Sequence, residues 1–579
     1  MFERNKQCSN YKDYAILLGN ITMSKQFVNA ICSINNKTVR WSDYDKLNLY
    51  LQSINTLITQ EHQEHKKKKT KPTYIIYVNS AIKDILPPYE NIEYQPIDRI
   101  LPVYSSFIHS FEIKELEVIL NKIKPYIDTM VDLIGTTKYK SIRKECEVGF
   151  GFIARRILEK IKPDLVCANT AYITKNNAPP PDIIKDYITP LKQYNVNKIV
   201  CKDIKNIIAY NVLKVDRDAS FWSNVYLHDT IISLEKLYAK NNKRQNKVIY
   251  RDIVNYYMQT DKTFLAKIYF KKPPVCKGNV DWLRLCNIDT TSVITVSHVT
   301  WLDIVENYDI TSKDIEVVEY YKAYTHPFPE HIRKLIQYMH EIKSRNKTEH
   351  NDILNLIIKQ IIHVLHGFGY CRAFTEEGNM QYYCDTFRNN NKCRQMPGNV
   401  LLNPYDADMF YEWTRHELLT MINMCDNIYN YDTDSVTTTQ QEGFKLIENY
   451  NNNLKQQYIN RNLNPDDYTH YGHLIGQLEI EAKCKAFYLM APKFYIYEED
   501  DKLKSTTTGY TKNIIANSIM HDAPTSNAVK ALEWFYNTDY VIPNLGYQYN
   551  GSFMSKVTFD KNRLLKNSQD LLSTLYLNI

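Results

Sequence analysis

Cysteine pairs in the spacing that metal sites use are missing from this chain. Its twelve cysteines are scattered over 579 residues, and no two of them stand as Cys-x-x-Cys. Cys371, Cys384 and Cys393 lie fairly close together, but their spacing fits no zinc-binding template. We therefore do not expect a zinc site, and we expect the thiols to be reduced and partly buried, as is usual inside cells.

Long hydrophobic runs are missing as well. No apolar segment reaches the length of a membrane-spanning helix, and the first residues are not followed by the hydrophobic region of a signal peptide. The net charge of +7 is small for this length, so it permits a phosphate-binding channel without requiring one. We expect an intracellular protein that is not secreted and has no membrane partner.

A pair of carboxylates is the first positive signal. Residues 427–438 contain a β-prone run, then Asp432, Thr433 and Asp434, then a second β-prone run. This pattern predicts a tight hairpin with the acids at its turn. Residues two apart in a strand share a face, so both carboxylates could point toward one hard divalent cation. An Asp-rich surface turn would give the same pattern.

A second acidic position and a basic strand accompany this hairpin. A short apolar run ends at Asp252, and an aromatic residue follows at Tyr257. Downstream of the hairpin, a β-prone segment carries Lys493 and Tyr495, which alternate and therefore share a face. Each motif alone is common in proteins, so the information lies in their order.

A predicted helix at 350–366 lies between the two acidic positions. Its Lys359, His363 and His366 are spaced i, i+4 and i+7, which places them on one helix face. A lysine on a helix is most often simply solvated. The position of this one between the acidic segments is what makes it a candidate.

In this order, the segments resemble the motifs of family B DNA polymerases, and most closely those of the protein-primed branch that serves viruses and linear plasmids. The Asp252 segment is similar to the first palm motif, usually Asp-x-x-Ser-Leu-Tyr-Pro. The residues 432–435 match the Asp-Thr-Asp-Ser core of the third motif, and 493–495 match Lys-x-Tyr. In the fingers motif Lys359 is retained, whereas histidines replace the usual Asn and Tyr.

The resemblance implies a mixed α+β fold of the right-hand polymerase type, with palm, fingers and thumb preceded by a degenerate exonuclease-like α/β domain. The implied boundaries are 1–245 for the N-terminal domain, 246–340 for the first part of the palm with an insertion, 341–370 for the fingers, 371–402 for a second insertion, 403–505 for the second part of the palm and 506–579 for the thumb.

The implied activity is template-directed DNA synthesis from dNTPs on a DNA template and primer. Catalysis would use two Mg²⁺ ions, for which Mn²⁺ can substitute. The resemblance implies that Asp252 and Asp434 bind the ions, with the backbone of Val254 as a further metal ligand. Asp432 and Lys493 complete the implied catalytic set.

The resemblance also implies roles in substrate binding. Lys359 would neutralise the triphosphate with help from Lys347, and Tyr257 would exclude a 2′-hydroxyl from the sugar site. His363 and His366 would touch the base or the phosphates, or would only pack within the fingers.

Tyr495, Lys512 and Arg415 are candidate DNA contacts. Tyr495, together with Lys493, could hold the primer end or the terminal phosphates, and Lys512 follows downstream in the sequence. Arg415, in a helix predicted at 404–424, would contact DNA, brace the acidic hairpin or stay on the helix surface.

The insertion after the first palm motif suggests a protein partner. Residues 300–308 resemble the short helix of this insertion, through which protein-primed members contact the terminal protein. Such a protein offers a Ser, Thr or Tyr hydroxyl in place of a 3′-hydroxyl.

Proofreading is not expected. The first exonuclease motif of related polymerases is Asp-x-Glu, and this pattern occurs nowhere before Asp252. Two alternatives to a polymerase stay open at this point. The chain could be a catalytically inactive, polymerase-derived nucleic-acid-binding replication protein. A glycosyltransferase with a metal-binding Asp-x-Asp would explain neither Lys359 nor Lys493.

Overall fold

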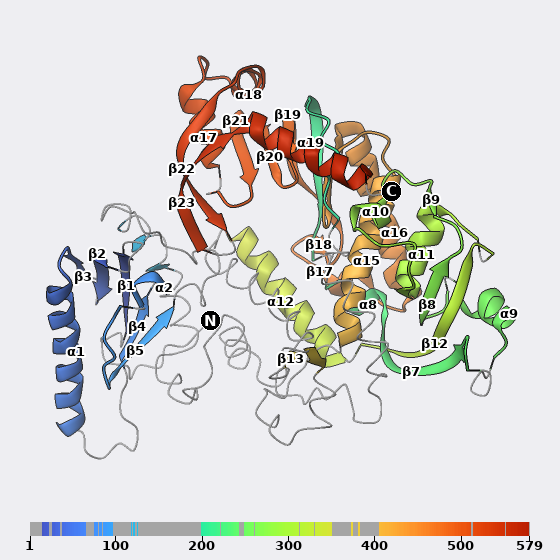
Figure 1. The fold of residues 1–579 in the computed structure, drawn as a ribbon, viewed down its shortest axis with the longest axis horizontal. Coiled ribbons are helices and arrows are strands. Elements are labelled where there is room, and N and C mark those ends of the chain that lie inside the picture. The colour runs from blue at the N-terminus through green and yellow to red at the C-terminus, as the bar shows by residue number, and fades with distance from the viewer. Residues whose placement is uncertain are drawn as a thin grey trace.

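The computed structural model describes most of the chain outside a long segment before residue 199 and a second one around 350–403. The described residues are 14–21, 26–34, 37–64, 74–78, 80–83, 85–96, 117, 120–121, 124–125, 199–219, 222–242, 248–259, 261–311, 313–328, 330–349, 372–374, 380–382, 404–510, 513–549 and 552–577. They form helices and sheets of the mixed α and β class (Figure 1).

An N-terminal sheet of five strands has its own hydrophobic core (Figure 1). Its order is β3-β2-β1-β4-β5; β1 pairs with β2 antiparallel but with β4 in parallel. Gly19 of β1 permits close packing of α2, because a Cβ there would lie 2.0 Å from Ile82 Cδ1. The elements are β1 (Tyr14–Ile21), β2 (Phe27–Ile34), β3 (Lys37–Trp41), α1 (Tyr44–Glu64), β4 (Tyr74–Val78), α2 (Ser80–Lys83) and β5 (Ile92–Pro96).

A six-stranded antiparallel sheet is the centre of the remaining structure. Its order is β15-β16-β6-β19-β20-β21, so β6, early in the sequence, lies between strands that come more than 200 residues later. Gly443 lets the covering helix α16 approach this sheet, since a Cβ there would lie 2.8 Å from Leu213 Cδ2. The strands are β6 (Ile208–Arg217), β15 (Ile428–Asp432), β16 (Ser435–Thr439), β19 (Leu478–Ala491), β20 (Phe494–Glu499) and β21 (Lys502–Thr507); α16 is Gln440–Asn460.

The expected boundary near residue 245 between the N-terminal domain and the palm does not separate the sheets of the structure. Both β6 and β7 (Asp229–Ala239) precede it, yet both pair with strands that follow it. The central sheet therefore includes residues that the sequence analysis placed in the N-terminal domain. The reason is that strand pairing over such a distance leaves no local mark in the sequence.

A second antiparallel sheet has the order β10-β8-β12-β7 and lies between β6 and α12 in the sequence. The expected short helix at 300–308 is confirmed as α11, which follows the edge strand β10. The elements are β8 (Phe264–Phe270), β10 (Ile294–Ser297), α11 (His298–Asn307), β12 (Ile315–Pro327) and α12 (Glu330–Thr348).

The C-terminal part continues from β21 through two helices, a hairpin and a last helix: α17 (Ile514–Asp522), α18 (Ala528–Asn537), β22 (Val541–Tyr549), β23 (Ser552–Asp560) and α19 (Lys561–Leu577). The remaining elements are α8 (Asn224–Leu227), α9 (Tyr250–Asp252), η3 (Ile253–Tyr257), β9 (Val275–Cys276), α10 (Trp282–Leu285), β11 (Tyr308–Asp309), β13 (Arg372–Phe374), β14 (Met380–Tyr382), α15 (Pro404–Asn423), η6 (Pro465–Tyr468), β17 (Thr469–His470) and β18 (His473–Leu474).

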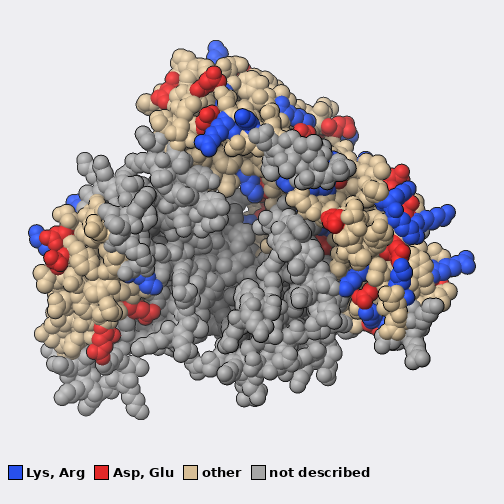
Figure 2. Space-filling model, viewed as in Figure 1, with Lys and Arg blue, Asp and Glu red and all other residues tan. Residues whose placement is uncertain are grey.

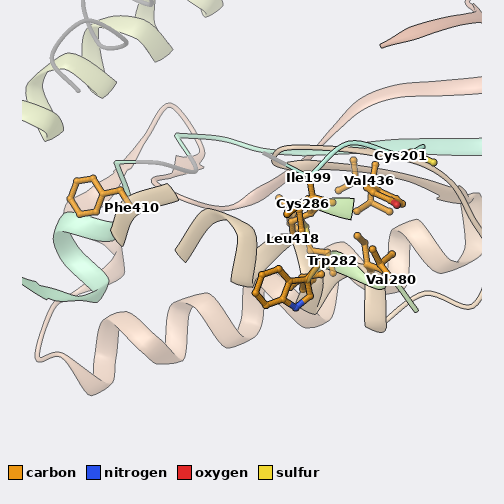
Figure 3. Packing of buried hydrophobic residues seen from close by; sticks show 14 of the residues in the cluster. Ile199, Cys201, Val280, Trp282, Cys286, Phe410, Leu418 and Val436 are labelled. Atoms are coloured by element: carbon orange, nitrogen blue, oxygen red, sulfur yellow. The ribbon is translucent and has the colours of Figure 1, made fainter. Parts of the chain in front are cut away.

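The inserted sheet is joined to the central sheet by a continuous apolar core. Figure 3 shows Trp282 and Val280 from the inserted region near Leu418 of α15 and Val436 of β16. All four side chains are buried. The core therefore fixes the insertion against the sheet that carries the acidic hairpin.

The described surface has a mixed charge, and most of the described cysteines are buried. On the face seen in Figure 2, Lys and Arg side chains alternate with Asp and Glu over the described parts, without a field of one sign. None of the described helices is both long enough and apolar enough to cross a membrane. Among the described cysteines, Cys32, Cys201, Cys286, Cys425 and Cys484 are buried, as expected.

A buried polar network connects α11 to α15. Arg415 Nε donates to Asp303 Oδ2 at 2.7 Å, both side chains are fully buried, and the guanidinium lies 4.4 Å from the Trp282 ring. His416 Nδ1 lies 2.8 Å from Asp303 Oδ1. The expectation that Arg415 contacts DNA, braces the hairpin or lies on the surface is therefore wrong. Its charge is compensated inside the core, where an unpaired arginine would be strongly destabilising.

The titration of His416 should make stability depend on pH. Burial alone would lower its pKa, but the hydrogen bond to Asp303 and the negative charges of Asp303, Glu417 and Glu306 together outweigh burial and raise the pKa from 6.5 to about 9. The charged form is favoured by folding, so this stabilisation is present below pH 6.5 and is lost as the pH rises through about 9. Relative to His416→Asn, the wild type should lose about 1–3 kcal/mol of unfolding free energy over this interval, measured by urea denaturation.

The control for this experiment is His521→Asn. His521 also neighbours an aspartate, Asp522, but its side chain is 86% exposed. Its substitution should leave the pH dependence unchanged. A wild-type advantage over His416→Asn that stays constant with pH would contradict the assignment.

Candidate active site

The acidic hairpin forms as the sequence predicted. β15 ends at Asp432 and β16 begins at Ser435, which pair across the turn. Thr433 has a φ of 58°, and the Asp434 N–H donates to the Asp432 carbonyl at 2.6 Å. A left-handed residue at the tip is what a tight turn requires. The two aspartates thus stand at the end of the strand pair.

A segment before β6 supports the outer edge of this hairpin. Thr433 N–H donates to the Ile199 carbonyl and Cys201 N–H to the Tyr431 carbonyl, both at 2.9 Å. Val200 forms a bridge with Asp432. The edge of β15 is therefore paired, and the turn is held from both sides.

Asp216 is the carboxylate that the structure brings to this hairpin. It is the Cα partner of Ser435 in the β6–β16 ladder, and the next residue, Arg217, donates its N–H to the Asp434 carbonyl at 3.1 Å. Burial, followed by the negative charges of Asp434 and Glu481, raises the pKa of Asp216 to about 8. The ionised form therefore needs a compensating positive charge.

Asp252 does not occupy that position. It lies in α9, which together with η3 follows the edge strand β7 and is found at the right-hand edge of Figure 1, outside the sheet of the hairpin. Val254 lies in η3 and shares this location. The expected convergence of Asp252 and Val254 with Asp434 is therefore not met, because the strand that pairs with β16 is β6.

The sequence contained a signal for Asp216. A β-prone run at 208–215 leads into it, and Phe221 follows five residues later, the same spacing as from Asp252 to Tyr257. The run before Asp252 is much shorter, and in the structure it is not a strand. Strand length would have favoured Asp216.

Lys493 reaches the hairpin, a contact that the sequence analysis did not predict although it placed Lys493 in the catalytic set. Its Nζ lies 2.9 Å from Asp432 Oδ2 and 3.0 Å from Oδ1. The residue stands in the turn between β19 and β20 with a φ of 63°, and its side chain is 45% exposed. Of the two hairpin acids, Asp432 thus carries an ion pair with lysine.

Tyr495 is buried beneath the site and is not exposed to DNA. Its side chain is 5% exposed, and its hydroxyl accepts a hydrogen bond from Lys214 Nζ at 2.7 Å. Lys214 also pairs with Glu481 Oε2 at 2.7 Å. The expectation of a direct DNA contact by Tyr495 is therefore wrong. Its phenol faces the strand β6, two residues before Asp216.

Asp218 joins the end of β6 to helix α12. Its carboxylate lies 2.9 Å from His340 Nε2 and forms an ion pair with Lys343 Nζ. Burial would raise its pKa, but these two partners outweigh burial and hold the pKa well below its usual range. The carboxylate is therefore ionised, and α12 is anchored two residues beyond Asp216.

The structure does not describe the side chains of the candidate nucleotide-binding residues or of Lys512. Lys359, His363, His366 and Lys512 lie outside the described residues. Tyr257 ends η3 and Lys347 lies in α12, but the description does not extend to their side chains. Their roles stay predictions.

The acidic pair has the chemistry of a magnesium site. Mg²⁺ is usually bound through one or two carboxylates, with the remaining positions taken by water and substrate phosphates. Asp216 and Asp434 supply such a pair, and the repulsion between them would be relieved by a cation. In the part of the chain that the structure describes, no three His, Cys, Asp or Glu side chains are grouped to hold a metal. Two carboxylates are compatible with an ion that takes its remaining ligands from water and substrate phosphates.

Comparison with known proteins gives similarity of structure only. No protein-family model and no curated protein matches the sequence. Phi29 DNA polymerase complexed with primer-template DNA and incoming nucleotide aligns at 12% identity, over 94% of this chain and 98% of that chain, with a TM-score of 0.47. The same polymerase with single-stranded DNA aligns at 12% identity, over 94% and 99%, with a TM-score of 0.45. No residue role is transferred from these structures.

The anchoring of α12 by Asp218 can be tested by a double-mutant cycle. Asp218 and Lys343 are 13% and 24% exposed, so their attraction is only partly screened. Asp218→Asn and Lys343→Met should show a coupling energy of about 1–3 kcal/mol in urea unfolding. The control is the Glu330–Lys334 pair on the same helix, which is 71% and 60% exposed and should show much weaker coupling because solvent screens it. Equal coupling in both cycles would argue against an anchoring role.

Proposed function

We propose that this chain is a DNA-directed DNA polymerase that adds dNTPs to a primer strand on a DNA template. The observation that carries the proposal is the meeting of Asp216 with Asp434 where neighbouring strands end, beside the ion pair of Asp432 with Lys493. These positions lie in three segments that are distant along the chain. Their convergence is what a metal-dependent nucleotidyl transfer site needs, and an incidental surface turn would not produce it.

The first palm motif is better assigned to Asp216 than to Asp252. Residues 216–222 resemble the family pattern Asp-x-x-Ser-Leu-Tyr-Pro in the aspartate and in the aromatic Phe221, with Ala219 in place of Ser. The role of excluding ribonucleotides then passes from Tyr257 to Phe221. Phe221 lies outside the described residues, so this role rests on the resemblance.

The chemistry requires positioning and charge neutralisation more than covalent catalysis. A primer hydroxyl attacks the α-phosphate of the dNTP, and pyrophosphate leaves. Asp216 and Asp434 would hold Mg²⁺, and Mn²⁺ can substitute. When bound, the metal neutralises the carboxylates and the phosphates. Lys493 orients Asp432 beside the pair, and Lys359 would neutralise the triphosphate, with Lys347, His363 and His366 nearby in the sequence.

Protein priming is part of the proposal. The four-stranded sheet inserted between β6 and α12 stands where protein-primed polymerases carry the insertion that contacts their terminal protein. Its α11 supports this resemblance. The terminal protein would present a hydroxyl to the same Asp216–Asp434 site, so no second active site is required.

Proofreading is proposed to be absent. In the N-terminal sheet, the central strands β1 (YAILLGNI) and β4 (YIIYV) contain no aspartate or glutamate. A nuclease that uses two metal ions needs carboxylates to hold them, and these two strands supply none. The sheet would then serve as a scaffold or as a surface for the displaced strand.

Primer extension distinguishes Asp216 from Asp252. Asp216→Asn and Asp434→Asn should each lower kcat by about 10²–10³ or more, because each removes charge stabilisation at the reacting phosphate. Asp252→Asn should stay within about threefold of wild type, because Asp252 lies outside the sheet of the site. The measurement is single-nucleotide extension of a primed DNA template with Mg²⁺ or Mn²⁺.

Two results would overturn the assignment. Loss of activity in Asp252→Asn with activity kept in Asp216→Asn would restore the motif assignment made from the sequence. DNA binding by the wild type without any extension would favour the alternative, an inactive nucleic-acid-binding replication protein.

The absence of proofreading has its own test. A primer with a 3′-terminal mismatch should keep its full length during incubation with the protein and Mg²⁺ in the absence of dNTPs. Gel analysis of the labelled primer gives the result. Shortening that persists in Asp216→Asn would reveal a nuclease site outside the acidic hairpin.

A further inference from the structure

Tyr495 and Lys214 form a buried unit next to the acidic pair. The Tyr495 ring packs against Phe487 at 5.3 Å and Tyr497 at 6.0 Å between ring centroids. Its hydroxyl is 2.7 Å from Lys214 Nζ. Lys214 itself is 5% exposed, so both ends of this hydrogen bond are removed from solvent.

Lys214 faces the same side of β6 as Asp216. Residues two apart in a strand share a face, so the ammonium of Lys214 and the carboxylate of Asp216 lie along one side of the sheet. Burial and the negative charges of Asp434 and Glu481 raise the pKa of Asp216, whereas the positive charge of Lys214 lowers it. Displacement of the ammonium would leave the carboxylates to repel one another.

A β-bulge supplies the third member of the unit. In the pairing of β19 with β6, Ile480 is opposite Val215 and Ala482 is opposite Lys214, which leaves Glu481 as the extra residue. Bulges re-aim side chains next to functional sites. Here the Glu481 carboxylate reaches Lys214 Nζ at 2.7 Å. Lys214 is therefore held between the Glu481 carboxylate, which is 43% exposed, and the buried phenol of Tyr495.

The segment that begins β20 also contacts β15, the strand that ends at Asp432. Lys493 precedes β20 and pairs with Asp432, whereas Tyr495 within β20 bonds to Lys214 of β6. One Lys-x-Tyr segment thus contacts both strands that carry the acids. Lys493 is partly exposed and contacts Asp432 directly. Tyr495 is buried and contacts the strand of Asp216 through Lys214.

We propose that Tyr495 is a positioning residue for nucleotidyl transfer: its hydroxyl holds Lys214, and Lys214 keeps Asp216 in place to bind metal. This inference rests on the proposed function for its catalytic consequence. It assigns Tyr495 a role that needs no contact with the primer.

The test is Tyr495→Phe, which removes only the hydroxyl and keeps the ring in its packing. We expect kcat to fall about tenfold, as for the loss of one hydrogen bond to a charged group. The KM for dNTP and the Kd for primer-template should stay within about twofold. The affinity for Mn²⁺ in the absence of DNA, measured by calorimetry, should fall about three- to tenfold. The matched control is Tyr497→Phe, two residues away in the same strand.

A second comparison asks whether Tyr495 acts through Lys214. The double variant Lys214→Met/Tyr495→Phe should lose no more activity and no more Mn²⁺ affinity than Lys214→Met alone. Independent, multiplicative losses would overturn the proposed route. Unfolding in urea identifies variants that fail to fold, and Tyr495→Phe alone then decides the question.

The outcomes separate this inference from the proposed function. A weaker Kd for primer-template with unchanged kcat would show a primer contact and overturn the inference, as would no change in either kcat or Mn²⁺ affinity. A wild type that extends no primer would refute the proposed function. The Mn²⁺ affinities of wild type and Tyr495→Phe would then still decide whether Tyr495 positions the acidic pair.

Discussion

The antiparallel pairing of β6 with β16 is the constraint on which the candidate site depends. It places Asp216 opposite Ser435 and brings the Asp434 carbonyl to the N–H of Arg217. A one-residue slip of this register would turn every side chain of β6 to the other face. Burial favours this register, because Leu213 and Val215 share one buried face of β6 and Gly443 fits closely over Leu213.

This pairing creates a concentration of negative charge that the rest of the structure balances. Asp432 is paired with Lys493, and Asp218 with Lys343 and His340. Burial, followed by the negative charges of Asp434 and Glu481, raises the pKa of Asp216. Neighbouring acids are thus paired with protein cations, and a divalent cation beside Asp216 and Asp434 would relieve the repulsion between these two carboxylates. A magnesium site that shares its ion with a substrate commonly uses one or two carboxylates.

The sequence predicted the parts of the site that are local. The hairpin at 428–439 and the helices at 298–307 and 404–423 depend on short patterns, whereas the ion pair of Lys493 with Asp432 was not predicted. Asp216 was missed because the choice between two Asp-to-aromatic segments is made by strand pairing with residues more than 200 positions later. The burial of Tyr495 and of Arg415 was missed for the same reason, since burial depends on which elements pack together.

The segment from Lys493 to Tyr495 shows why two side chains that the sequence placed on one face take different positions. A Lys-x-Tyr pair on alternating strand positions was expected to present both side chains to DNA, because residues two apart share a face. In the structure Lys493 stands in the turn before β20 with a left-handed backbone, so the alternation begins only after it. The turn directs the lysine toward Asp432 and leaves the tyrosine in the sheet, facing Lys214. Because of this one left-handed residue, Lys493 contacts Asp432 of β15 and Tyr495 contacts Lys214 of β6, and the two side chains do not form one DNA-binding face.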